Sequence, residues 1–135
     1  KIRMNSRSED ETMKLVITAT KDNLDAAIDP RFGRCNFFIF TDPETLECEV
    51  KKNEQKNAMG GAGIQAAQTI AQAQVDVLIT GAVGPNAFQT LKAANIKIFT
   101  GACGTVQEAI DAYKKGLLKE AHDSTVKSHH GIGSQ

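Results

Sequence analysis

Hydrophobic and polar positions along the chain change from a two-residue period to a helical period, and the change outlines the fold. Three early segments rich in β-branched and aromatic residues are expected to be strands: 14–20, 36–41 and 46–52. In the last segment Leu46, Cys48 and Val50 alternate with charged residues, which predicts a half-exposed strand with Cys48 packed on the core. The short turn 42–45, with Pro43 at its second position, makes the second and third strands antiparallel.

The second half of the chain alternates helical and strand patterns. We expect helices at 64–74, at 85–94 and after residue 105, and strands at 76–80 and 96–100. Pro85 suits the first position of a helix, Thr105 with Glu108 fits a capping box, and Gly116 suits a helix C-terminus. The predicted fold class is α/β: an antiparallel three-stranded meander followed by an αβαβα series, with the helices packed on a mixed sheet.

Four of these strands are predicted to end at one edge of the sheet. Strand–helix–strand units join parallel strands, so 46–52, 76–80 and 96–100 run in one direction, and a meander makes 14–20 parallel to them. Their following loops are 21–35, 53–63, 81–84 and 101–104. Open α/β sheets bind ligands at this edge, so we expect these loops to form a single binding site.

The loops at this edge are rich in glycine. They contain Gly60, Gly61, Gly63, Gly81, Gly84, Gly101 and Gly104. A tight turn explains any one of them, but their concentration before three helix N-termini predicts an anion-binding edge. Arg31 and Arg34 would add bidentate anion contacts, or would be solvated loop charges. The segment 61–66 also matches a dinucleotide-binding pattern, but its distance from the preceding strand favours a general amide cradle.

Composition and charge exclude several classes of function. The chain has 135 residues, is 41% hydrophobic and has zero net charge, which indicates a soluble domain with no electrostatic footprint for nucleic acid or an anionic membrane. Its apolar stretches are too short to span a bilayer. We expect a flexible N-terminal extension at 1–12, a single α/β domain at 13–120 and a flexible tail at 121–135.

Three widely spaced cysteines give no disulfide framework and no CxxC pair, which favours free thiols in a reducing, cytoplasmic setting. Cys35 and Cys103 fall at the ligand edge and are our candidate metal ligands. Cys103 lies in the loop just before a helix, where a thiolate is stabilised. No histidine lies between residues 13 and 120, so the usual Ser-His-Asp and Cys-His arrangements are absent and we expect no enzymatic activity.

Five motifs, in this order, resemble the dinitrogenase iron–molybdenum cofactor biosynthesis family. They are the strand 14–20, Arg31-Phe32-Gly33-Arg34, Gly60-Gly61-Ala62-Gly63, Gly84-Pro85-Asn86-Ala87 and the loop 101–105. That family includes NifX, NafY, the C-terminal domain of many NifB proteins and small stand-alone members. The resemblance covers about residues 13–120 and implies a ribonuclease-H-like fold.

The resemblance also implies a function and a set of site residues. It implies a non-enzymatic carrier of an iron–sulfur or iron–molybdenum cluster, or its precursor, which exchanges cargo with donor and acceptor proteins. The candidate cofactor-binding residues are Arg31, Phe32, Gly33, Arg34, Gly60, Gly61, Gly63, Gly84, Pro85, Asn86, Gly104 and Thr105. Two alternatives stay open: a small enzyme or sensor that binds a phosphorylated metabolite or nucleotide at the same edge, and a protein-interaction module.

Overall fold

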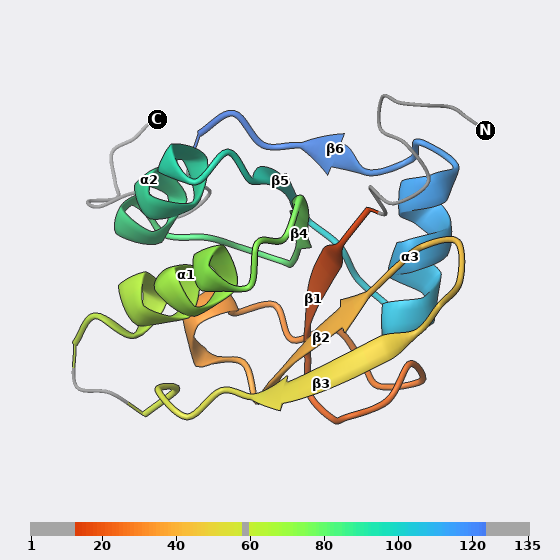
Figure 1. Ribbon diagram of the computed structural model, residues 1–135, viewed down its shortest axis with the longest axis horizontal. Coiled ribbons are helices and arrows are strands. Elements are labelled where there is room, and N and C mark those ends of the chain that lie inside the picture. Colours follow the sequence, from red (N-terminus) through yellow and green to blue (C-terminus); the bar gives the residue numbers. More distant parts are fainter. Residues whose placement is uncertain (1–12, 58–59, 124–135) are drawn as a thin grey trace.

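A six-stranded mixed sheet lies between two layers of helices in the computed structural model, which describes residues 13–57 and 60–123 (Figure 1). In chain order the elements are β1 (Leu15–Ala19), a one-turn 3-10 helix (Phe32–Arg34), β2 (Phe37–Thr41), β3 (Cys48–Lys52), α1 (Ala62–Gln72), β4 (Val77–Ile79), α2 (Pro85–Ala93), β5 (Lys97–Thr100), α3 (Val106–Lys114) and β6 (Lys119–Glu120).

The strands lie in the order β3-β2-β1-β4-β5-β6. β1 pairs antiparallel with β2 and parallel with β4, β2 pairs antiparallel with β3, and β4 pairs parallel with β5. The predicted α/β class, the meander and the shared direction of β1, β3, β4 and β5 are therefore confirmed. β6, which pairs antiparallel with β5, was not predicted, and the ribonuclease-H-like assignment stays a prediction.

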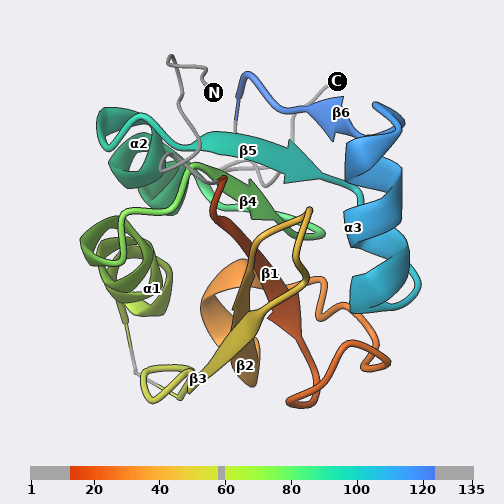
Figure 2. The ribbon, with the colours of Figure 1, turned by 45° about the vertical axis from the view of Figure 1, so that its right-hand side comes forward.

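The core has two halves, one on each face of the sheet. Figure 2 shows α1 and α2 on one side of the sheet and α3 on the other. Val16 of β1 faces α1 and α2, where it belongs to a cluster with Ile70 and Leu91. Ile17 faces α3 and belongs to the second cluster, with Ile110. All five residues of β1 are buried because this strand is central and both of its faces are covered by helices.

The sequence prediction was wrong about the buried face of β3. All five of its residues are exposed, including Cys48, which was expected to be a core residue. β3 is the edge strand, and in the part of the chain that the structure describes no helix packs extensively against it. Of the three alternating apolar positions, Leu46 is partly buried against the core, whereas Cys48 and Val50 are exposed, so the alternation mainly reflects the pleat of the strand.

Of the predicted domain limits, the structure describes the chain on both sides of the C-terminal one, at residue 120. The extension at 1–12 and most of the tail at 121–135 lie outside the described residues. The backbone N–H of Ala121 donates to Ile98 O at 2.7 Å, and the Ala121 side chain packs against the core, so the folded part continues at least to Ala121. Among residues 13–57 and 60–123 no helix has both the length and the apolar character needed to cross a bilayer.

Candidate functional site

A cleft of about 460 Å³ opens at the edge of the sheet where β1 and β4 end. Its walls come from three segments far apart in sequence: 30–34 with the 3-10 helix, the start of α1 and the start of α2. The predicted site residues that line it are Arg31, Phe32, Gly33, Arg34, Gly61, Gly63, Gly84, Pro85 and Asn86. The structure thus brings together most of the residues that the sequence singled out.

Backbone contacts hold the first wall of the cleft against the end of β4. Ala82 N–H donates to Pro30 O at 2.8 Å, and Phe32 N–H donates to Ala82 O at 3.3 Å. Gly81 permits this contact, because a Cβ atom there would lie 2.5 Å from the Cα of Pro30. The segment after β1 is therefore fixed directly beside the loop that leads into α2.

A second close approach joins the 3-10 helix to α1. A Cβ atom on Gly33 would lie 2.7 Å from the Cα of Gly63, which is in the first turn of α1. A Cβ atom on Gly63 would in turn lie 3.4 Å from the Cβ of Ala87 in α2. Glycine at position 33 is thus required by a backbone-to-backbone contact, and the three walls interlock.

The two helix ends at the cleft have no side-chain caps. α1 begins after Gly61, α2 begins after Gly84 with Pro85 in its first turn, and neither helix has an acidic residue in that turn. α3 differs, because Thr105 and Glu108 form the predicted capping box. The first amides of α1 and α2 therefore give the cleft a partial positive charge, which suits an anion.

Two arginines stand at the rim of this cleft. The backbone N–H of Arg31 donates to Asp29 Oδ1 at 3.1 Å, and its Nε lies 3.3 Å from the same oxygen. The Asp29 side chain is 2% exposed and that of Arg31 is 65% exposed, so a buried carboxylate anchors an exposed guanidinium. Arg34 Nη1 donates to Lys56 O at 2.6 Å. Both arginines line the cleft together with the first residues of α1 and α2.

Asn53 holds the 3-10 segment in place and was missed by the sequence analysis. Its buried Nδ2 donates to Gly33 O at 3.1 Å and to Cys35 O at 2.9 Å. Its Oδ1 accepts from Gln55 N–H at 3.2 Å. The available signal was a polar residue directly after a strand, but the sequence did not show that its amide turns inward.

The two predicted metal ligands lie apart from each other. Cys35 is fully buried in the core behind the 3-10 segment, and burial, reinforced by the negative charge of Asp29, raises the pKa of its thiol to about 12. Its thiol is therefore protonated in this conformation, which disfavours metal ligation. Cys103 is exposed and lies in the loop before α3, outside the residues that line the cleft.

The remaining predicted residues also lie outside the cleft lining. Gly60 is exposed and precedes the cleft residues of α1. Gly104 O accepts from Ile28 N–H at 2.9 Å, and the Thr105 hydroxyl caps α3. These residues join α3 to the loop after β1 on the other face of the sheet. In the part of the chain that the structure describes, no three His, Cys, Asp or Glu residues gather into a metal-binding group.

Comparisons with known proteins agree with this arrangement. The family model described as dinitrogenase iron–molybdenum cofactor matches residues 13–116. The apo form of the orange protein from Desulfovibrio gigas is 37% identical, with a TM-score of 0.82, and the match covers 85% of this chain and 98% of that chain. A Thermotoga protein that carries the provisional name NifB is 39% identical, with a TM-score of 0.70, over 80% and 92% of the two chains. A protein of Methanocaldococcus jannaschii is 29% identical over 96 residues, which span 69% of this chain and 81% of that protein.

Proposed function

The chain belongs to the dinitrogenase iron–molybdenum cofactor family, and from this premise we propose that its cleft holds an anionic metal–sulfur cluster, or a precursor of one, as cargo. The observation that carries the proposal is the convergence of two uncapped helix N-termini and two arginines on one cleft. The proposed role is carriage and release of the cluster without chemical conversion.

The donor groups of the cleft fit such a cargo. Sulfide and oxide edges of an anionic cluster accept hydrogen bonds from amides and guanidinium groups. Its volume of about 460 Å³ falls within the range of about 300–1,000 Å³ that small-molecule sites occupy. No cysteine is among the lining residues, so a cluster that arrives with its own ligands can be held by electrostatics and released intact.

A thiol outside the cleft can still help to retain the cluster. Cys103 is exposed and lies at the same edge of the sheet, whereas Cys35 would have to leave the core before it could ligate a metal. We therefore propose Cys103 as the thiol that assists cluster retention and propose Cys35 only for a rearranged state. Cys103→Ala should lower the metal retained after desalting, and Cys48→Ala, at the opposite end of the strands, should not.

The name of one relative supports a protein that takes up a bound group. The orange protein was solved in what is called its apo form, the term for a protein without its bound group. The second candidate cargo is a phosphorylated metabolite or nucleotide, because phosphate binds to helix N-terminal amides in the same way. The two cargoes differ in colour, since a metal–sulfur cluster absorbs visible light and a nucleotide does not.

Anaerobic reconstitution with iron, sulfide and molybdate tests the proposal. After desalting, visible absorption and metal analysis of the wild type should show stable colour and stoichiometric metal. The Arg31→Ala/Arg34→Ala variant should lose most of the metal, and Lys115→Ala, which removes an exposed cation at the end of α3, should not. Full loading of the double variant would contradict a cargo site at this cleft. A colourless wild type that is stabilised by inorganic phosphate would favour the second candidate.

A further inference from the structure

β3 is a sheet edge that pairs with β2 on one side and, among the described residues, with no strand on the other. In Figure 1 it runs along the outside of the molecule. All five of its residues are exposed, and Val50 at its centre is 39% exposed. Unpaired strand edges are templates for a further strand. This surface is separate from the cleft and does not depend on the cargo.

The backbone of β3 shows which residues could pair with another strand. The bonds from Asp42 N–H to Glu47 O, at 3.4 Å, and from Asn53 N–H to Asn36 O, at 2.9 Å, lie at the two ends of the β2–β3 ladder. Hydrogen-bonded and non-hydrogen-bonded pairs alternate along an antiparallel ladder. The residues bonded to β2 are thus the odd-numbered ones, and Cys48, Val50 and Lys52 direct their N–H and C=O groups outward.

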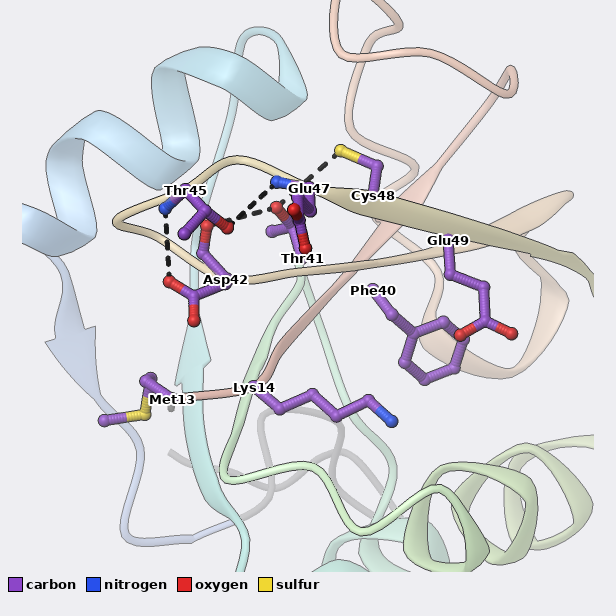
Figure 3. A pocket seen from close by; sticks show the side chains of 9 residues that line it. All are labelled: Met13, Lys14, Phe40, Thr41, Asp42, Thr45, Glu47, Cys48 and Glu49. Atoms are coloured by element: carbon purple, nitrogen blue, oxygen red, sulfur yellow. Dashed lines mark hydrogen bonds between the residues drawn. The ribbon is translucent and has the colours of Figure 1, made fainter. Parts of the chain in front are cut away.

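The side chains of β3 have opposite charges on either side of Val50. Glu49 and Lys51 pair with Phe40 and Phe38 and lie on the same face of the sheet. Figure 3 shows Glu49 beside the ring of Phe40 and Cys48 directed the other way. Lys14 shares a 360 Å³ pocket with Glu49, but its Nζ donates to Ala73 O at 2.9 Å. Within residues 13–57 and 60–123, Glu49 and Lys51 make no ion pair.

We propose that β3 pairs with β3 of a second copy of this chain, antiparallel about a two-fold axis at Val50. Val50 and the partner's Val50 then form a hydrogen-bonded pair, and Cys48 exchanges backbone bonds with the partner's Lys52. Glu49 lies opposite the partner's Lys51, in a non-hydrogen-bonded pair where Cα atoms are about 4.5 Å apart. The two sheets continue into one, and each unpaired carboxylate meets an unpaired ammonium.

Charge selects this register over its neighbours. Moving the axis by one residue towards the N-terminus places Glu49 opposite the partner's Glu49. Moving it one residue the other way places Lys51 opposite the partner's Lys51. Like charges directly opposite are destabilising, and opposite charges in the same position are stabilising. The axis at Val50 also brings the two exposed valines together, which removes apolar surface from water.

The interface is small, which sets the expected strength. Pairing through a five-residue strand alone buries less than the roughly 1,200–2,000 Å² of stable complexes. We therefore expect a weak dimer whose population rises with protein concentration and falls with added salt. Sedimentation equilibrium of the full 135-residue chain over a wide concentration range measures it. A monomer at every concentration would overturn the proposal.

A charge exchange separates this pairing from other modes of association. Glu49→Lys and Lys51→Glu each replace both cross-strand ion pairs with like charges, so each should weaken dimerisation on the order of tenfold. The variant that carries both substitutions restores opposite charges and should return to within about threefold of the wild type. Loss of dimer in the double variant, or no loss in the single ones, would contradict the register.

Cysteine cross-linking tests the position of the axis. In a background with Cys48→Ser and Cys103→Ser, Val50→Cys should form a disulfide-linked dimer, because hydrogen-bonded pairs place Cα atoms about 5.5 Å apart. Lys51→Cys is the matched control, since the two copies of residue 51 would be too far apart for a disulfide. Cross-linking at 51 in preference to 50 would overturn the proposed axis.

Discussion

The thiol of Cys35 lies fully buried beneath the cleft, and burial raises its pKa from an ordinary value of 9.0 to about 12. The folded state therefore keeps a proton that the unfolded state loses above about pH 9. Below about pH 9 the neutral Cys35 thiol makes its full contribution to the free energy of unfolding. Between about pH 9 and 12 that contribution declines by up to about 1.4 kcal/mol per pH unit.

Cys35→Ala should therefore flatten the alkaline fall in stability while lowering stability near neutral pH through the lost packing. Urea unfolding of both proteins under reducing conditions, from pH 7.5 to about pH 10.5, measures the two slopes. The two exposed cysteines contribute equally to both curves. Parallel slopes would show that Cys35 is not buried as a neutral thiol.

Gly33 provides a second test at the scale of single residues. A Cβ atom there would meet the backbone of Gly63, which cannot turn aside as a flexible side chain can. We expect Gly33→Ala to lower the free energy of unfolding by about 1–3 kcal/mol, the typical cost of overpacking. Gly60→Ala is the matched control, because nothing lies within 4 Å of its added Cβ. Equal thermal unfolding temperatures for the two variants would contradict the close contact between the 3-10 helix and α1.

The capping box of α3 is the clearest local signal in the sequence at the scale of elements. The Thr105 hydroxyl accepts from Glu108 N–H at 3.1 Å, and Glu108 Oε1 accepts from Thr105 N–H at 2.9 Å. Thr105→Ala should destabilise the protein by about 1 kcal/mol in chemical denaturation. Thr90→Ala should cost less, because among the described residues the Thr90 hydroxyl bonds only back to Asn86 O within α2. A larger loss at Thr90 would reverse this ranking of the two hydroxyls.

Element limits were predictable where local chemistry sets them. α2 and α3 begin where Pro85 and the Thr105 cap predict. α1 begins two residues earlier than expected, and Gly63 in its first turn leaves room for the backbone contact with Gly33. β3 begins two residues late, since Leu46 has a φ of 60° and closes the preceding turn. β6 has two residues, too few to give a periodic signal.

At the scale of the whole molecule, the sequence predicted that four loops lie at one edge of the sheet. It did not predict which of these loops lie on the face covered by α1 and α2 and which on the face covered by α3. Strand direction follows from the connections, so the edge could be read from the order of elements. The face on which each helix packs depends on tertiary contacts that its sequence does not specify. α1 and α2 share one face and form the cleft, whereas α3 lies on the other and takes Cys103 with it. The inward turn of Asn53 depends on the same tertiary packing.

A ligand that binds only the folded protein raises its unfolding temperature, so an anion that binds in the cleft should do so. The chain has zero net charge, so an anion is attracted by the local arginines and helix ends and not by the molecule as a whole. At a concentration of about 100 times Kd, binding adds about 2.7 kcal/mol of stability. Molybdate should raise the unfolding temperature of the wild type, less at high salt, and should leave Arg31→Ala/Arg34→Ala nearly unchanged. Equal shifts in both proteins would place the anion elsewhere, whereas a shift confined to the wild type would assign it to the cleft formed by the starts of α1 and α2.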